Sequence, residues 1–418
     1  MVATVLSPVY PVTDRFVNIA RETITGTPAA AGFASIPVAG FDPDPKLQML
    51  EDKGLRGAMT SIFDLQPGPY WGETSISASP LFGDTIGHIL YNIFGDYTVV
   101  GTTGSPTFTA PGGIVPGAGP ITITSATAAV AGTFIQIGSG TTSEIVTVGT
   151  GSTVTSIVIA AATPIRFTHT GSTAITTVVA PFTHTFSILN PASSTGSVSC
   201  QPPTHTLIDR NQTAGSAGFY ADVYPYGCFS SVKLTGAATG LLTWEGSFTS
   251  WPQQAATVAP VASWSSARSI PAWKGTSTVG GTLVPNITDW GITLTRTVEP
   301  IPTVDGQQAP SVIARGPLDS TFDLTYDPAV DQSALNNYLN DVQPSLLWTT
   351  TNGLSGASLV SFSVTGLLGA STKAQLKADK TQFGYSVSGD LVGNTTNVGN
   401  SGGYGPVQVV LINAVPSY

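Results

Sequence analysis

The stretch from Thr98 to His205 is almost without charge, because its 108 residues include one acid, Glu144, and one base, Arg166. Most of the other residues are Thr, Ser, Gly, Ala, Pro, Val and Ile. Small and β-branched residues favour strands and turns, whereas a catalytic site needs several ionisable groups brought together. The stretch therefore predicts β-structure that forms a surface, and it indicates a structural protein and not an enzyme.

The composition of the whole chain points the same way. Of its 418 residues, 41% are hydrophobic and only 9% are charged, with a net charge of −9. This hydrophobic content is too high for a disordered chain, and so little charge leaves sheet edges without their usual protection against association. We expect a subunit that buries much of its surface against copies of itself. The sequence contains no basic cluster, so we do not expect tight binding to phosphate groups.

The hydrophobic pattern divides the chain into a core, residues 1–97 and 181–418, and an inserted module, residues 98–180. Within the module, short apolar runs are separated by Gly, Ser and Thr turns, which predicts a small Ig-like sandwich or barrel. The runs are Phe134–Ile137, Ile145–Val148 and Ile157–Ile159. The segment Ala110–Pro120, rich in Gly and Pro, is predicted to be a hinge or linker.

The core alternates apolar and polar residues with the period of β-strands. The predicted strands include Leu242–Phe248, Trp290–Arg296, Phe322–Tyr326, Phe362–Val364, Phe383–Val387 and Val407–Ile412. We predict a helix from Asp84 to Phe94 that Gly95 ends. A second helix is predicted from the N-cap Asp327-Pro328 to Val342, lying across a sheet with an apolar face of Val330, Ala334, Leu335, Tyr338, Leu339 and Val342.

The N-terminal region, within residues 1–60, is predicted to be irregular. Six prolines interrupt it, namely Pro8, Pro11, Pro28, Pro37, Pro43 and Pro45. Its segment Asp42–Gly57 mixes acids and bases and is predicted to be a loop.

The residues that suggest chemistry have simpler interpretations. His169, His184 and His205 lack the tight local pairing of zinc ligands, so we expect strand or loop histidines. Pairs of acids such as Asp42 and Asp44 lack the pattern of a calcium loop and are expected to be solvated. No nucleotide-binding loop occurs, and Ser230–Lys233 matches S-x-x-K without companion motifs. We predict no catalytic residue, metal or cofactor.

Cysteine and tryptophan give weaker indications. Cys200 and Cys228 are expected to be buried free thiols, with a disulfide between them as the alternative. Trp244 and Trp290 fall on the apolar phase of strands and are expected in the core. Trp251, Trp264 and Trp273 lie in a connection rich in Pro and Ser, where they could fill contacts between subunits.

The N-terminus lacks the pattern of a signal peptide, and no apolar run has the length of a membrane-spanning helix. We therefore expect a chain that is made and kept in a cytoplasm, or that leaves it by a route other than secretion.

Three stretches of the core resemble the tail tube protein (major tail protein) of long-tailed bacteriophages. The first is Ala20–Pro28, continued by Leu55-Arg56-Gly57 and the helix Asp84–Gly95. The second is His184–Ile188 with Gln201–Leu207, leading into Tyr226–Cys228 and the strand pair Ser231–Phe248. The third is Pro302–Gly316 with Thr321–Val342. The segment Ala131–Ile175 resembles modules that decorate virion proteins of phages infecting actinobacteria.

The resemblance implies a β-sandwich or barrel with a packed helix, of which six copies close into a ring. Rings stack into a hollow tube, assembled in the host cytoplasm, that conducts viral DNA into the host. Implied partners are the tape measure protein, the tail terminator and the distal tail or baseplate proteins. If each copy gives about four strands to an inner barrel, the backbone diameter is about 37 Å, which a DNA duplex passes.

The tube interpretation assigns roles to two groups of charged residues. The candidates for contacts between rings are Asp42, Asp44, Glu51, Asp52, Lys53 and Arg56, with Lys53 and Arg56 pairing acids of the adjacent ring. The candidates for an acidic bore, along which DNA slides without sticking, are Asp305, Asp319 and Asp323. The inserted module is expected to project outward, because a module of this size would block the bore.

Two other functions stay open. A surface adhesin or capsid decoration protein could bind cell-surface glycans through the module and the tryptophans, and it would form a discrete oligomer. A polysaccharide-degrading enzyme would need a pair of carboxylates at suitable spacing, and the sequence offers no persuasive pair.

Overall fold

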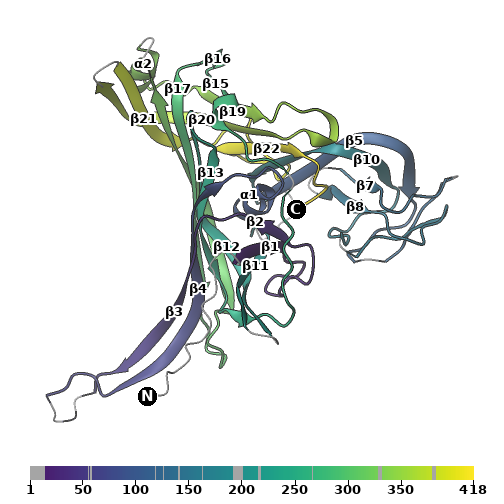
Figure 1. Ribbon diagram of the computed structural model, residues 1–418, viewed down its shortest axis with the longest axis horizontal. Helices are drawn as coiled ribbons and strands as arrows, with labels where there is room; N and C mark the ends of the chain where they lie inside the picture. The colour runs from purple at the N-terminus through teal and green to yellow at the C-terminus, as the bar shows by residue number, and fades with distance from the viewer. Residues whose placement is uncertain are drawn as a thin grey trace, which may run out of the picture.

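The chain folds into a mainly β protein with few helices, as the sequence predicts (Figure 1). This computed structural model describes residues 15–54, 56, 59–117, 119–125, 127–139, 142–161, 163–191, 201–214, 218–265, 267–327, 332–378 and 383–418. Among these residues, twenty strands join in one antiparallel hydrogen-bonded network, and two short strands form a separate pair. The network consists of three sections. Some long strands bend and take part in two sections, and in this way they connect them.

The first section, called here the large sheet, runs along the left of the molecule in Figure 1. Its strands, in order of pairing, are β3 (Phe41–Asp52), β4 (Asp64–Pro80), β13 (Leu242–Ser250), β12 (Gly218–Ala237), β17 (Ile287–Ile301), β18 (Val312–Tyr326), β21 (Phe383–Leu391) and β20 (Ser361–Ala378).

The second section faces the first. Its strands are β5 (Gly95–Ala110), β10 (Thr173–Ile188), β22 (Val407–Asn413), the first part of β20, β19 (Ser345–Thr351), β15 (Thr276–Val279) and β16 (Thr282–Leu283), with β7 (Phe134–Ile137) and β8 (Glu144–Thr147) beside the first part of β10. The third section consists of β2 (Ala34–Ile36), β1 (Phe16–Arg21), β11 (His205–Ala214), the first part of β12 and β14 (Gln254–Ala255). The separate pair is β6 (Ile121–Thr122) and β9 (Ser156–Ile157).

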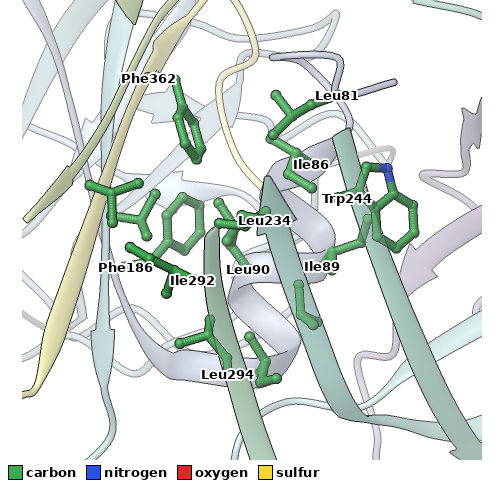
Figure 2. Packing of buried hydrophobic residues seen from close by; sticks show 14 of the residues in the cluster. Leu81, Ile86, Ile89, Leu90, Phe186, Leu234, Trp244, Ile292, Leu294 and Phe362 are labelled. Carbon is green, nitrogen blue, oxygen red and sulfur yellow. The ribbon is translucent and has the colours of Figure 1, made fainter. Parts of the chain in front are cut away.

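The helix α1 (Ile86–Phe94) lies between the large sheet and the second section, and each of its residues is buried. Figure 2 shows its isoleucine and leucine side chains against residues of the surrounding strands, including Leu234, Trp244, Ile292 and Phe186. Gly95 ends the helix with a positive φ of 88° and donates its N–H to Tyr91 O, so the predicted helix stop is confirmed. The helix is more buried than a one-sided apolar stripe predicts, because sheets cover it from more than one side.

The predicted alternation in the core strands is confirmed. Trp244 and Phe248 on β13, Ile292 and Leu294 on β17, and Phe322 on β18 are all buried in one continuous cluster. On β21 the pattern holds for Tyr385 and Val387, whereas Phe383 at the start of the strand is exposed.

The prediction of an irregular N-terminal region was wrong for β1 and β2, which lie inside it. The loop predicted at Asp42–Gly57 was wrong over most of its length, because Asp42–Asp52 belongs to β3. Strand β3 pairs with β4 and with no other described strand, so one of its edges is free. Pro43 and Pro45 lie two residues apart and therefore direct their ring nitrogens to the same edge. A missing N–H on a free edge breaks no hydrogen bond, so both prolines are tolerated in this strand.

The second helix is also shorter than predicted. It forms as α2 (Ser333–Leu339), with Gln332 and not Asp327 in the N-cap position; Pro328 and Val330 lie outside the described residues. Leu335 packs against the core, while Tyr338, Leu339 and Val342 are exposed, so the predicted apolar face was largely wrong. Two 3-10 segments in the described part of the chain are η4 (Ala272–Lys274) and η5 (Gly356–Ser358).

The inserted region has its own hydrophobic cluster, built from residues between Phe108 and Ile175. The predicted hinge at Ala110–Pro120 is not free: Ile114 exchanges two backbone hydrogen bonds with His169, and Gly117 exchanges two with Ile165. Strands β5 and β10 each continue from the core into this region as one strand, and their pairing shifts register between Val179 and Phe182 and between Thr176 and Val178. The positions 98 and 180, which the sequence suggests as module boundaries, therefore fall inside continuous strands.

Candidate functional site

The three stretches that carry the family resemblance meet in space around buried polar side chains. The carboxylate of Glu22, which is 4% exposed, accepts four hydrogen bonds. Its donors are Gly26 N (2.8 Å), Thr204 Oγ1 (2.6 Å), Thr206 Oγ1 (2.9 Å) and Tyr226 N (2.7 Å). This residue thus joins the first stretch to the second.

Asn92 on α1 makes a second connection to the same segments. Its Nδ2 donates to Gly227 O (2.9 Å) and Pro203 O (3.1 Å) and lies 2.9 Å from His205 Nδ1. Its Oδ1 accepts from Phe229 N (2.7 Å). Asn92 therefore ties the central helix to β12 and to the segment before β11, and sequence reasoning did not single it out.

Arg315 brings in the third stretch. Its backbone N–H and its Nε both donate to Gln201 Oε1 at 3.0 Å, and its Nη1 donates to Pro202 O. Because these polar groups satisfy one another inside the fold, they stabilise the architecture and present no reactive group to solvent.

The histidines considered as metal ligands lie apart. His184 on β10 contacts Tyr97 Oη (2.9 Å) and Asn413 Oδ1 (3.1 Å), while His205 and His169 occupy other sites. Burial lowers the pKa of His184 to about 4 and that of His88 to about 3, and it holds the pKa of His205 well below its usual value. Within the described part of the chain, no group of three or more metal-binding side chains forms.

The predicted contacts between rings lie along the hairpin of β3 and β4, which projects from the body toward the lower left of Figure 1. Asp42 and Asp44 lie near its base, where Lys46 pairs with Asp44 and reaches Glu73 at 3.7 Å. At the far end, Lys53 pairs with Glu51 and Arg56 pairs with Asp52. The predicted residues are thus brought together, but the acids and bases at the far end neutralise one another within one chain.

The hairpin also exposes apolar side chains that the prediction did not include. Leu47, Met49 and Leu50 on β3 and Leu65 on β4 are each about half exposed. A projecting ribbon with this many exposed apolar groups is typical of a surface that another protein covers.

Two of the three bore candidates share one exposed face. Asp319 and Asp323 on β18 point to the side opposite the buried Phe322, and they pair with Thr295 and Gly291 of β17. We call this the outer face of the large sheet; the other residues that define it are Thr243, Glu245 and Ser247 of β13, Ser231, Lys233 and Thr235 of β12, Thr293 of β17, Thr321 of β18 and Asp390 of β21.

Hydroxyl groups dominate the outer face, and its charge is mainly negative. Lys233 pairs with Glu245 at 3.3 Å, whereas Asp319 and Asp323 form no ion pair with any described side chain. Asp305 is separate from them, because it lies in the loop between β17 and β18. Hydrogen bonds from Gln307 N–H and from the Thr303 hydroxyl lower the pKa of its carboxyl group.

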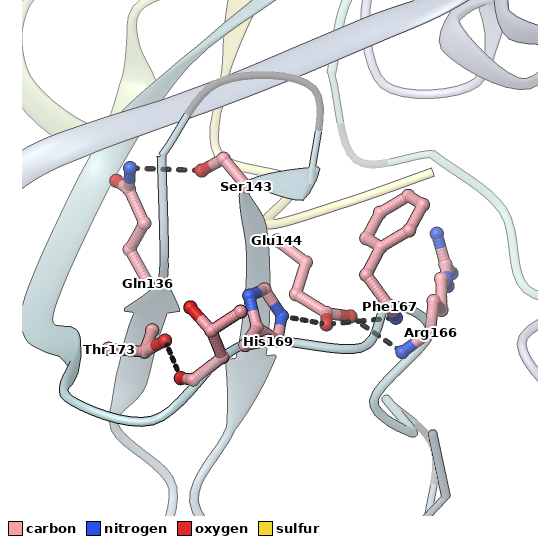
Figure 3. A network of polar contacts seen from close by, with 8 residues as sticks. Gln136, Ser143, Glu144, Arg166, Phe167, His169 and Thr173 are labelled. Atoms are coloured by element: carbon pink, nitrogen blue, oxygen red, sulfur yellow. Dashed lines mark hydrogen bonds and ion pairs between the residues drawn. The ribbon is translucent and has the colours of Figure 1, made fainter. Parts of the chain in front are cut away.

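The single acid of the uncharged stretch organises the inserted region (Figure 3). The carboxylate of Glu144 accepts from Arg166 N (2.8 Å) and Phe167 N (3.2 Å) and lies 2.9 Å from His169 Nε2. The Arg166 side chain extends away from this carboxylate, and its Nη1 donates to Tyr418 O. The only acid and the only base of the stretch therefore have separate structural roles.

The paired residues of β5 and β10 show where the inserted region can be deleted. Thr103 and Val178 face each other, so replacing residues 104–177 by Asn-Gly should close a tight hairpin. We expect a folded core whose free energy of unfolding is lower by about 2–4 kcal/mol, because the bonds from Arg166 to Tyr418 and from Ser143 to Val99 are lost. Urea unfolding followed by circular dichroism measures this; a chain without cooperative unfolding would show that the core depends on the insert.

The two tryptophans that the sequence places in the core are buried there. Trp244 and Trp290 are buried, while Trp264 and Trp273 are 54% and 68% exposed. Their expected role in subunit contacts stays a prediction. Cys228 is a buried free thiol whose pKa burial raises to about 11; Cys200 lies outside the described residues.

The architecture thus defines a mainly β protein with a projecting hairpin, a hydroxyl-rich outer face and a buried structural network. No protein-family model matches the chain, and no curated protein is significantly similar to it in sequence. The resemblance to tail tube proteins therefore stays a prediction. None of the helices in the described ranges is long and apolar enough to cross a membrane.

Proposed function

We propose that this protein is a structural subunit that polymerises into stacked rings, forming the tail tube of a long-tailed bacteriophage. The observation that carries the proposal is the hairpin of β3 and β4. It projects from the body and exposes apolar residues along much of its length. Covering such a surface with a second copy removes apolar area from water, which stabilises an assembly.

The outer face of the large sheet supports a role as the wall of a conduit. The outer face consists mainly of serine and threonine hydroxyl groups and the carboxylates of Asp319 and Asp323, and its named cation, Lys233, is paired with Glu245. A duplex passing such a wall would release few counterions and would bind weakly. The proposed partners are those that the family resemblance implies: the tape measure protein inside the tube, and the tail terminator and the distal tail or baseplate proteins at its ends.

The test is negative-stain electron microscopy of the purified protein, which should show hollow rods. The variant Leu47→Ser/Leu50→Ser/Leu65→Ser should form no rods, because it loses the apolar contacts of the hairpin while these exposed positions leave the core unchanged. Circular dichroism checks that the fold is retained.

The matched control is Val115→Ser/Val130→Ser/Val154→Ser, which changes three exposed apolar residues of the inserted region. It should form rods as the unchanged protein does, because the insert is proposed to point away from the bore. Discrete rings or single copies in place of rods would favour an adhesin or decoration protein. Rods from the hairpin variant would reject the proposed contact.

A further inference from the structure

A pocket lies where five distant parts of the chain meet. Its walls come from the end of β1, the start of α1, the loop of the inserted region that carries Arg166, and the C-terminal residues Val415–Tyr418. Its volume is about 450 Å³. The segment around Trp264 closes one side. Two hydrogen bonds hold this segment in place: Ser35 N donates to Ser263 O (3.0 Å), and Ser263 N donates to Ser35 Oγ (2.7 Å).

Two guanidinium groups, from Arg21 and Arg166, line this pocket. The Arg21 group lies over the ring of Tyr91, with Cζ 4.9 Å from the ring centroid, and its Nε and Nη1 are buried without a hydrogen-bond partner among the described residues. The Arg166 side chain donates from Nη1 to Tyr418 O. Leaving a buried charged donor unpaired costs free energy, so the Arg21 group calls for an acceptor.

For Arg21, the described surroundings do not supply that acceptor. His88 also lines the pocket; it is 7% exposed, and its Nδ1 has no partner in the described structure. Asp84 is the one acid on the wall, and it forms no ion pair with either arginine. Burial lowers the pKa of His88, and the charges of Arg166 and Arg21 lower it further. Burial and the Arg21 charge lower the pKa of Arg166, and the charge of Glu144 opposes this in part.

We propose that this pocket binds an oxyanion, a carboxylate or phosphate group, between Arg21 and Arg166. A guanidinium presents several N–H donors in a plane, which matches the oxygens of either group. A cation would be repelled by the two arginines, and an apolar ligand would leave their donors unpaired. The oxyanion could be free in solution, or it could be a carboxylate of a second copy; the second source rests on the proposed function.

The first test titrates the unassembled full-length protein with inorganic phosphate at constant ionic strength, using calorimetry. Arg21→Gln and Arg166→Gln should each weaken binding by about tenfold or more. The matched control is Arg268→Gln, which removes the same charge at an exposed position outside this pocket and should leave binding unchanged. Equal weakening by all three variants would mean a general charge effect and would overturn the site.

A second variant is expected to raise the thermal unfolding midpoint, which a merely structural role of the arginines does not predict. Thr23 is exposed and lines the same pocket as the two arginines, so Thr23→Glu would add a carboxylate to its wall. Without phosphate, its thermal unfolding midpoint should be higher than that of the unchanged protein, and phosphate should raise it no further. A lower midpoint, together with undiminished phosphate binding, would overturn the proposal.

Comparison of assembled and unassembled protein identifies the source of the oxyanion. Phosphate binding by single copies but not by rods would assign the site to a carboxylate of a neighbouring copy. Equal binding by both forms would assign it to a free anion. If no rods form, the titration of single copies and of the arginine variants still tests the site itself. No binding by either form, with both arginine variants assembling normally, would overturn the inference while leaving the tube proposal intact.

Discussion

Replacement of Asn92 by alanine is expected to lower the free energy of unfolding by about 4 kcal/mol, because three buried backbone groups lose their partner. These are the carbonyl groups of Pro203 and Gly227 and the N–H group of Phe229. The intrinsic preference of alanine for helices offsets only about 0.5 kcal/mol of this loss. Urea unfolding followed by tryptophan fluorescence measures the difference.

Two further substitutions separate the lost hydrogen bonds from other effects. Asn92→Leu retains most of the side-chain volume, so it should be as destabilising as Asn92→Ala if unpaired polar groups are the cause. Asn336→Ala makes the same chemical change at an exposed position of α2 and should alter stability by less than about 0.5 kcal/mol. If Asn92→Ala behaved like Asn336→Ala, the network around α1 would contribute little to stability.

Mild acid should destabilise the protein through its buried histidines. The pKa of His88 is lowered to about 3 and that of His184 to about 4, mainly by burial, and the pKa of His205 is lowered as well. Unfolded histidine titrates near 6.5, so the unfolded chain binds more protons than the folded chain below that pH. The stability is fully present above about pH 6.5 and falls by about 1.4 kcal/mol per pH unit for each histidine as the pH decreases.

The substitution His88→Leu isolates one histidine from the carboxylates that also titrate in acid. Between about pH 7 and about pH 5, its loss of stability should be smaller than that of the unchanged protein by about 2 kcal/mol. Urea unfolding at the two pH values gives both differences. An identical loss in the two proteins would show that His88 becomes protonated without unfolding. The groups that surround this ring are His205, Tyr418, Arg21 and Arg166.

The sequence predicts well those elements whose signal is local. Alternation places Trp244, Ile292 and Phe322 in the core, and Gly95 ends α1 because its positive φ suits glycine. The mainly β class follows from the same patterns. These features depend on neighbours within a few residues, which a single sequence contains.

The remaining features depend on partners far along the chain. Pro43 and Pro45 indicate a loop until β3 is known to be a free edge. Tyr338 and Leu339 resemble the buried face of a helix, yet α2 packs on the body chiefly through Leu335. Glu22 and Asn92 find their distant partners among residues 203–229, and no short motif announces a buried polar residue of this kind.

The continuity of β5 and β10 between core and inserted region has a mechanical consequence. A side module on a flexible tether points in many directions and blurs when images of a particle are averaged. Here two paired strands and the bond from Arg166 to Tyr418 fix its direction. Any regular array of this chain would therefore display its modules at the repeat of the array itself, as sharp, evenly spaced knobs.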